Sequence, residues 1–247
     1  MKKTKWLAAC IAACALALVA GCSSGDGDDG EPELPGIEYD AEKWVIEGTT
    51  VVRYTGAEAD VRIPNGVTII GESAFKGCKS LKSVTIPTSV MSIGHGAFED
   101  CNILEITYGG TLAQWCQMDN DWNLLYDAES IKLSDGTDLK SLTTLKIPSG
   151  VTKIGRYAFY NCTILASVTI PGSVTSIGDY AFLMCMRLAS VTIPASVKSI
   201  GWRAFGGTNL EEVKYGGTAE QWKKIDIDSD AFPSTAKIYD KEDKEIK

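Results

Sequence analysis

Residues 168–190 read VTIPGSVTSIGDYAFLMCMRLAS, and this stretch decides the fold because it recurs along the chain. Each copy runs from Ile-Pro through a Val, an Ile-Gly pair and an Ala-Phe pair to a Leu, usually with a Cys before the Leu. Adjacent copies are spaced by 23 residues. The Ile-Pro pairs are Ile63-Pro64, Ile86-Pro87, Ile147-Pro148, Ile170-Pro171 and Ile193-Pro194. A fixed period of this length is typical of a solenoid in which each repeat forms one coil.

The pattern inside each unit predicts how a coil is built. Alternation in Val84-Thr85-Ile86 indicates a short strand with Val and Ile inward and Thr outward. A second apolar pair, such as Val174 and Ile177, fits the opposite wall of the coil. The glycine that follows, such as Gly178, is expected to supply a turn into an Ala-Phe segment, which we expect to be a helical turn. Coils bury these faces by stacking at about 4.8 Å, with equivalent strands paired in parallel.

A longer variant of the coil occurs twice. The segment from Tyr108 to Trp115 matches the segment from Tyr215 to Trp222 at a constant offset of 107 residues. In each copy a Thr precedes a Gln by three residues, which is the spacing of a capping box and predicts a helix after each Gly-Gly. We expect the second copy to close the C-terminal end, and residues 42–60 to cover the first coil, because open solenoid ends expose strand edges.

The N-terminus has the layout of a secretory signal. Three lysines precede an apolar run from Trp6 to Ala20, which is too short to span about 30 Å of hydrocarbon comfortably. The residues Val19-Ala20-Gly21-Cys22 resemble a bacterial lipobox, so we expect cleavage before Cys22 and lipidation of its thiol. Two or three acyl chains hold a protein durably at a membrane without a transmembrane helix.

The residues after Cys22 predict a tether. Only one of the next fourteen residues is apolar, and they are rich in Asp, Glu, Gly and Ser, so they cannot offset the entropy of ordering. As a coil this linker reaches roughly 20 Å. Its acidic cluster also resembles the tag that sends some Gram-negative lipoproteins to the outer leaflet of the outer membrane, the alternative being a spacer with no address. We therefore expect an exported outer-membrane lipoprotein that is exposed on the surface.

Charge limits the partners. Removal of residues 1–21 takes away three lysines and no acids, which leaves 21 basic and 32 acidic residues and a net charge of −11. Such a chain repels phosphate backbones, so nucleic acid is a poor partner. The expected organisation is a signal peptide at 1–21, a linker at 22–37 and a solenoid at 38–247, the last divided into a cap at about 38–60, coils at 61–107, a variant coil at 108–140, coils at 141–214 and a C-terminal variant coil at 215–247.

These repeats resemble those of the BspA-like leucine-rich repeat family, over about residues 45–247 and with the motif complete in five coils. The resemblance implies a mainly β, curved, right-handed solenoid of leucine-rich type with short helical turns. It also implies a bacterial surface protein, since adhesin and host-protein-binding roles are known in the family. Fold alone does not establish function.

Five cysteines remain once the signal and Cys22 are set aside: Cys78, Cys101, Cys116, Cys162 and Cys185. An odd number excludes a complete disulfide framework. All but Cys116 share one repeat position, so in adjacent coils they stack with their side chains pointing the same way, which is poor geometry for a bridge. We favour buried apolar thiols. Metal binding has no support, because the only histidine is His95 and no Cys-x-x-Cys occurs.

No catalytic set is visible in the sequence. His95 is alone on what should be an outward turn, so a Ser or Cys nucleophile lacks its usual base. The acids from Asp119 to Asp138 and at the C-terminus are dispersed, which we interpret as a solvated face. A phosphate-binding glycine loop is missing as well, and no cofactor is expected.

The outward positions of the strands, expected to be concave, form a polar stripe that we take as the candidate ligand surface. Its members are Arg62, Thr85, Thr107, Lys146, Thr169, Thr192 and Lys214. Solenoids commonly bind along such a face, and the three basic residues place cations on an acidic protein. The alternative is that threonine is simply a good exposed strand residue.

Trp115 and Trp222, with Trp122 nearby, are a second candidate, because tryptophan stacks on sugar rings. A repeated tryptophan in the first turn of a capped helix more often packs in the core. The expected function is a non-enzymatic, membrane-tethered surface protein that binds an extracellular protein, such as a host matrix protein, or another cell. The alternatives are a glycan-binding accessory of a polysaccharide-uptake system, which would use the tryptophans, and a hydrolase, which would need two convergent carboxylates.

Overall fold

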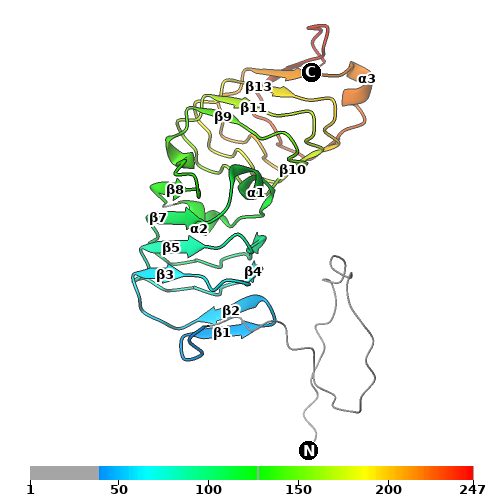
Figure 1. The fold of residues 1–247 in the computed structure, drawn as a ribbon. Helices are drawn as coiled ribbons and strands as arrows, with labels where there is room; N and C mark the ends of the chain where they lie inside the picture. Colours follow the sequence, from blue (N-terminus) through cyan, green and yellow to red (C-terminus); the bar gives the residue numbers. More distant parts are fainter. Residues whose placement is uncertain (1–38, 127, 247) are drawn as a thin grey trace, which may run out of the picture. The chain divides into compact units, whose positions relative to one another are not determined.

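The computed structural model describes residues 39–126 and 128–246, and in these ranges the chain is a β-solenoid with a repeat of about 23 residues and few short helices. This confirms the predicted fold class. Figure 1 shows the strands stacked one above another. The predicted signal peptide, the lipidation of Cys22 and the acidic linker lie outside the described residues. No helix within the described ranges has the length and apolarity needed to cross a membrane.

The strands form four sheets, in which the neighbours named are hydrogen-bonded. We call the first two sheets the first array: β1 (Trp44–Glu47), β2 (Thr50–Tyr54), β4 (Ile69–Ile70) and β6 (Ser92–Ile93), and then β3 (Asp60–Arg62), β5 (Ser83–Ile86), β7 (Glu105–Tyr108) and β8 (Ser130–Lys132). The other two are the second array: β9 (Thr144–Lys146), β11 (Ser167–Thr169), β13 (Ser190–Ile193), β15 (Glu212–Tyr215) and β17 (Lys237–Tyr239), and then β10 (Lys153–Ile154), β12 (Ser176–Ile177), β14 (Ser199–Ile200) and β16 (Asp226–Ile227).

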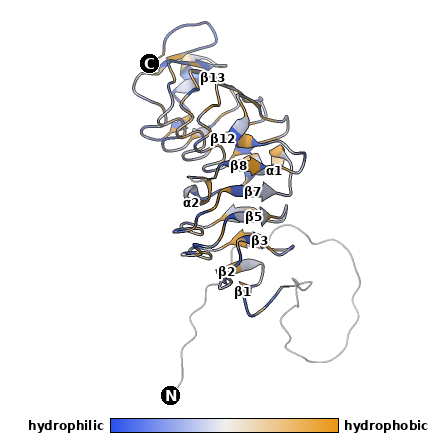
Figure 2. Ribbon diagram, turned by 90° about the vertical axis from the view of Figure 1, so that its left-hand side faces the viewer, coloured by the Kyte–Doolittle hydropathy of each residue, from blue (hydrophilic) through white to orange (hydrophobic). Residues whose placement is uncertain are grey.

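Parallel pairing between coils follows the predicted register. Val61 lies beside Val84, and Thr85 beside Thr107. The Val and Ile of each strand are buried while the residue between them is outward, so the alternation seen in the sequence decides which face meets the core. In Figure 2 the strands accordingly carry both hydrophobic and hydrophilic residues.

The second array repeats the first over a longer stretch than the sequence match indicated. The outward residues Arg62, Thr85, Thr107 and Lys132 occupy one register row, and Thr169, Thr192, Lys214 and Tyr239 occupy another, each at an offset of 107 residues. The turn after the last strand repeats too, because Leu133 N donates to Thr137 O and Asp240 N to Lys244 O. The repeat therefore runs from β3 to the turn after β8, and again from β11 to the turn after β17.

A ladder of phenylalanines forms the centre of the core. The rings of Phe75 and Phe98 stack with centroids 4.7 Å apart, and in the second array Phe159, Phe182, Phe205 and Phe232 stack at 5.2–5.3 Å. Ring spacing thus follows the coil spacing of a parallel sheet. Phe232 extends the ladder into the C-terminal variant coil, where no Ile-Pro marks the repeat.

The glycine of each Ile-Gly pair is needed for close approach and not, as expected, for a turn. A Cβ on Gly155 would lie 2.1 Å from Met118 O, and one on Gly178 would lie 2.8 Å from Arg156 N. Neither glycine adopts a left-handed φ. Backbone of one coil rests here on backbone of the coil before it, so only glycine fits.

Where a helical turn was expected, the Ala-Phe segment is a series of tight turns and not a regular helix, because Ala74 N donates to Gly71 O, Lys76 N to Ser73 O and Cys78 N to Phe75 O. The residue just before the Ala has a left-handed φ in six coils, among them Ser73 at 56° and Tyr180 at 56°. A second left-handed residue follows four positions later, for example Asp100 and Met184. Each such residue ends an incipient helical turn, since a right-handed helix cannot continue through it.

The predicted helices after each Gly-Gly are confirmed. Both α1 (Leu112–Gln117) and α3 (Ala219–Trp222) begin with a complete capping box, from Thr111 with Gln114 and from Thr218 with Gln221. Two further short helices are α2 (Trp122–Tyr126) and the 3₁₀ helix η1 (Leu139–Ser141).

Residues of the first variant coil join the two arrays. Gly155 N donates to Cys116 O at 2.6 Å, and Arg156 N donates to an Asp119 carboxylate oxygen at 2.9 Å. The other Asp119 oxygen accepts from Lys153 Nζ at 2.7 Å. Strands β8 and β9 belong to different sheets, so α1 and the residues after it carry the connection.

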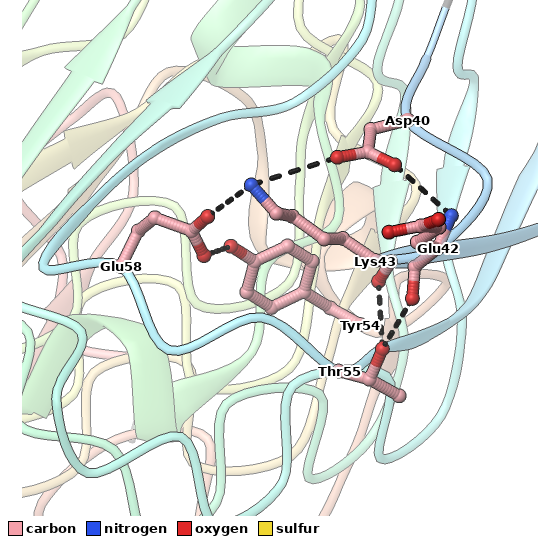
Figure 3. A network of polar contacts seen from close by, with 6 residues as sticks. All are labelled: Asp40, Glu42, Lys43, Tyr54, Thr55 and Glu58. Carbon is pink, nitrogen blue, oxygen red and sulfur yellow. Dashed lines mark hydrogen bonds and ion pairs between the residues drawn. The ribbon is translucent and has the colours of Figure 1, made fainter.

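A β-hairpin packs on the first coil. The antiparallel hairpin of β1 and β2 pairs with β4, and Trp44 and Tyr54 pack on Phe75, the end of the ladder. Figure 3 shows the polar network that stabilises this cap: Glu58 accepts from Lys43 and from the Tyr54 hydroxyl, and the Thr55 hydroxyl lies within hydrogen-bonding distance of the carbonyl oxygens of Glu42 and Lys43, just before β1.

Candidate binding surfaces

The predicted stripe is a real row of side chains, but it is divided between two sheets. Arg62, Thr85 and Thr107 lie in register in the first array. Lys146, Thr169, Thr192 and Lys214 lie in register in the second array. Lys132 completes the first row and Tyr239 the second. Both were missed because their strands are followed neither by Ile-Pro nor by Tyr-Gly-Gly, the sequences that mark the strands of the other coils.

Charge is distributed unevenly along the stripe. Lys132 is paired with Glu105 at 2.6 Å, and Lys214 lies 3.6 Å from both Glu212 and Asp243. These exposed pairs contribute little to stability, but they neutralise the two lysines locally. Lys146 is exposed, and the described part of the chain shows no carboxylate paired with it. It is the most available cation in the second row.

A parallel row of outward side chains runs beside the stripe in the second array. Its members are Thr144, Ser167, Ser190, Glu212 and Lys237. The outer face of β9, β11 and β13 therefore consists of short hydroxyl side chains next to Lys146. Hydroxyls that donate and accept hydrogen bonds lose little rotamer entropy on binding, so such a face suits a polar partner surface.

The two copies of the variant coil place their tryptophans in different surroundings. Trp115 is fully buried, and its indole N–H donates to Ala158 O at 2.8 Å, so its ring cannot contact a glycan. Trp222 is also largely buried, but it lines a cavity of about 450 Å³ with Phe232 and Pro233. Trp122 is 38 % exposed, and its ring meets the edge of Tyr126.

The five cysteines in the described part of the chain are free thiols. Cys101 Sγ donates to Phe75 O at 3.1 Å, and Cys185 Sγ to Phe159 O at 3.3 Å, each reaching the preceding coil. Burial raises the pKa of Cys101 to about 11 and that of Cys116 to about 12. Such thiols are poor nucleophiles and metal ligands, because the thiolate is the reactive form.

The acids between Asp119 and Asp138 are not a uniform solvated face, and that interpretation was wrong. Asp121 is 1 % exposed, and Asp119 joins the two arrays. Asp138 caps η1 and accepts from Ile131 N. Lys140 Nζ reaches the carbonyl oxygens of Leu125, Tyr160 and Asn161 at 3.0–3.4 Å. The charged residues of the first variant coil therefore bind it to the adjacent segments of the chain.

One surface was missed by sequence reasoning. In the second array the two residues after the coil glycine form a ladder of aromatic rings flanked by guanidinium groups, which we call the aromatic ladder: Tyr157, Tyr180, Trp202, Arg156 and Arg203. Comparing this variable pair between coils would have found it, because the first array has Glu-Ser and His-Gly there. His95 is exposed, and within the described ranges no group of three His, Cys, Asp or Glu side chains could hold a metal.

Stacked coils with parallel strands, a buried apolar position at every turn and outward polar rows define a leucine-rich-repeat-type solenoid. The family model for the BspA type leucine rich repeat region matches in six copies, over residues 53–118 and 115–238. Because these matches cover most of the chain, the protein belongs to the BspA-type leucine-rich repeat family. No curated protein matches the chain.

Similar solved structures are leucine-rich repeat proteins of bacteria. A leucine rich cell surface protein from Faecalibacterium prausnitzii is 25 % identical over 74 % of this chain, with a TM-score of 0.42, and the chain spans 55 % of that protein's length. The T. pallidum leucine rich repeat protein is 28 % identical over 72 % of this chain and 71 % of its own, with a TM-score of 0.33. The family assignment rests on the repeat motif and not on these superpositions.

Proposed function

We propose that the protein is a non-enzymatic, lipid-anchored protein of the bacterial surface that binds an extracellular protein, such as a host matrix protein or a protein of another cell. Leucine-rich repeat solenoids typically serve interaction and not catalysis. The lipobox at residues 19–22 supports anchoring, and the acidic linker supports a solenoid held close to the membrane with free orientation.

The observation that carries this proposal is the outward face of β9, β11 and β13. Equivalent residues there are paired in register, so hydroxyl groups recur at the coil spacing beside the unpaired Lys146. Repetition of the same donors and acceptors along a sheet suits a large partner with many weak contacts. The corresponding face of the first array has its terminal lysine, Lys132, paired with Glu105.

Charge reversal tests this face. The full chain and its Lys146→Glu variant are compared for binding to immobilised host extracellular matrix proteins, with Lys198→Glu as the matched control. Lys198 is an exposed lysine just before β14, on the other wall of the same array. We expect Lys146→Glu alone to weaken binding, with thermal stability unchanged in both variants. Equal binding by the parent and Lys146→Glu would refute the assignment of this face.

Anchoring is tested separately. Replacement of Cys22 by Ala should release the protein from the membrane fraction, and protease treatment of intact cells should remove the parent protein. Persistence of the protein after protease treatment would place it on the inner side of the envelope and contradict surface display.

The alternative of a glycan-binding accessory in polysaccharide uptake is favoured by one observation, the cavity beside Trp222. A panel of glycans against the full chain and a Trp222→Ala variant tests it. Binding that is lost in the variant would support the alternative, and absence of glycan binding would remove it.

A further inference from the structure

The aromatic ladder is a continuous cluster on the second array. The rings of Tyr157 and Tyr180 stack face to face, with centroids 4.6 Å apart and planes inclined by 2°. Trp202 meets Tyr180 edge-on at 5.1 Å, and it is 40 % exposed. Arg156 lies over the Tyr157 ring and Arg203 over the Trp202 ring, at 5.6 and 5.3 Å. Three consecutive coils thus present aromatic edges between two cations.

The first array is an internal control for this surface. At the offset of 107 residues, Tyr180, Trp202 and Arg203 correspond to Ser73, His95 and Gly96. The main-chain conformation is the same at both places, because Ser73 and Gly96 are left-handed, with φ of 56° and 61°. The coil therefore folds without any aromatic side chain at these positions, and packing does not require the ladder.

Local conformation argues against large residues at these positions. Tyr157 and Tyr180 have φ of 56°, and Arg203 has φ of 48°, in the region that favours glycine. Bulky side chains held at such angles on a surface indicate a role other than folding.

The chemistry of the ladder selects an acidic ligand. Every ion pair found among the described residues uses a lysine, so the guanidinium groups of Arg156 and Arg203 have donors to spare. Lys153, three residues before Arg156, is paired with Asp119, and a carboxylate oxygen of Asp179 accepts from Trp202 N. A guanidinium lying on an aromatic ring is poised to bind a carboxylate in a fork-like geometry.

The arrangement of the rings favours a protein over a glycan. The two tyrosines cover each other's faces, and the arginines lie over Tyr157 and Trp202, so little ring face is left for a sugar to stack on. What remains are ring edges and guanidinium donors. Tyr, Trp and Arg are also the residues that most often dominate protein–protein binding energy.

We propose that the aromatic ladder is a second binding surface, which takes an acidic, extended segment of a partner protein through Arg156 and Arg203. This proposal rests on the proposed function in one respect, because both require that the partner is a protein. It differs from the strand face in position and in chemistry, since carboxylates and apolar side chains, and not only polar groups, are recognised.

The test uses the full chain and a variant in which the second array takes the residues of the first, Tyr180→Ser with Trp202→His and Arg203→Gly. The probes are a short synthetic peptide in which glutamate alternates with leucine and phenylalanine, the same peptide with glutamine for glutamate, and polygalacturonate. The matched control variant is Arg187→Gly, which removes an exposed arginine elsewhere in the second array.

We expect the parent and Arg187→Gly to bind the glutamate peptide, at least tenfold better than the glutamine peptide, and the triple variant to lose at least tenfold in affinity while melting at no lower temperature. Equal binding of the two peptides, unchanged binding by the triple variant, or preference for polygalacturonate would overturn the proposal. Lys146→Glu should leave peptide binding unchanged, so failure of the ladder and failure of the strand face are distinguishable.

Discussion

The indole N–H of Trp115 donates to the carbonyl oxygen of Ala158 at 2.8 Å, and this buried hydrogen bond joins the first array to the second. Its counterpart in the second copy, Trp222, has no hydrogen-bond partner for its indole within the described residues and lines a cavity instead. The first variant coil thus connects the two arrays, whereas the second lies at the C-terminal end of the second array.

Replacement of each tryptophan by Phe measures how much the hydrogen bond between the two arrays contributes to the free energy of unfolding. Trp115→Phe leaves the Ala158 carbonyl without its donor in a buried site, which costs about 2–3 kcal/mol of unfolding free energy. Trp222→Phe should cost only about 1 kcal/mol, because only packing is reduced. Denaturant titrations of both variants give these free energies. Equal losses would contradict a stabilising role for the hydrogen bond between the arrays.

Replacement of Gly155 by Ala tests the close approach between coils. The added methyl would lie 2.1 Å from Met118 O, a backbone atom that cannot move alone, so we expect a loss of about 3 kcal/mol. Gly172→Ala is the control, since nothing lies within 4 Å of that Cβ position. It should be neutral, or stabilising by about 0.5 kcal/mol. Thermal denaturation distinguishes the two, and a tolerated Gly155→Ala would show that the coils are not held so closely.

Acid should loosen the N-terminal cap. Hydrogen bonds from Lys43 and Tyr54 hold the pKa of Glu58 at about 2, below its usual 4.5. Because the folded pKa is lowered, the Glu58 contacts stabilise the cap fully above about pH 4.5 and are lost as the pH falls toward 2. Hydrogen exchange of the β1 amides should therefore speed up in this window relative to a Glu58→Gln variant, in which the contacts are absent at every pH. Identical pH dependence in the two proteins would exclude this role.

Thiol labelling tests the cysteine assignment. With the pKa of Cys101 raised to about 11 and that of Cys116 to about 12, little thiolate exists at pH 8. In the native protein, alkylation should reach the half-buried Cys78 and Cys101 slowly and Cys116 only after unfolding. Rapid labelling of Cys116, or a mass lower by two hydrogens from a Cys78–Cys101 bridge, would contradict free, buried thiols.

Most of the fold was predictable because short sequence patterns that recur in each coil determine it. The Val-x-Ile alternation decides which strand face is buried, and the Thr-x-x-Gln spacing marks both capped helices. Contacts between distant segments were not predictable. The pairing of Asp119 with Lys153, 34 residues away, depends on how the first variant coil folds between the two arrays.

The binding surfaces were predictable only in part, for a related reason. The predicted stripe follows from strand alternation, and its residues lie in register in the strands, but Lys132 and Tyr239 lie in strands that neither Ile-Pro nor Tyr-Gly-Gly follows. The aromatic ladder depends on a column of variable residues, where Tyr180 and Trp202 replace Ser73 and His95. A comparison of repeat motifs ignores positions that vary between coils, whereas in the structure the residues at these positions are in contact.

The central claim is that a protein partner docks on the second array, and lysine footprinting tests it most directly. The full chain is acetylated with and without a matrix protein bound, and the modification of Lys146 is compared with that of Lys132, the lysine at the end of the first row. We predict that the partner protects Lys146 and leaves Lys132 unchanged. Protection of Lys132 alone, or of neither lysine, would contradict the account.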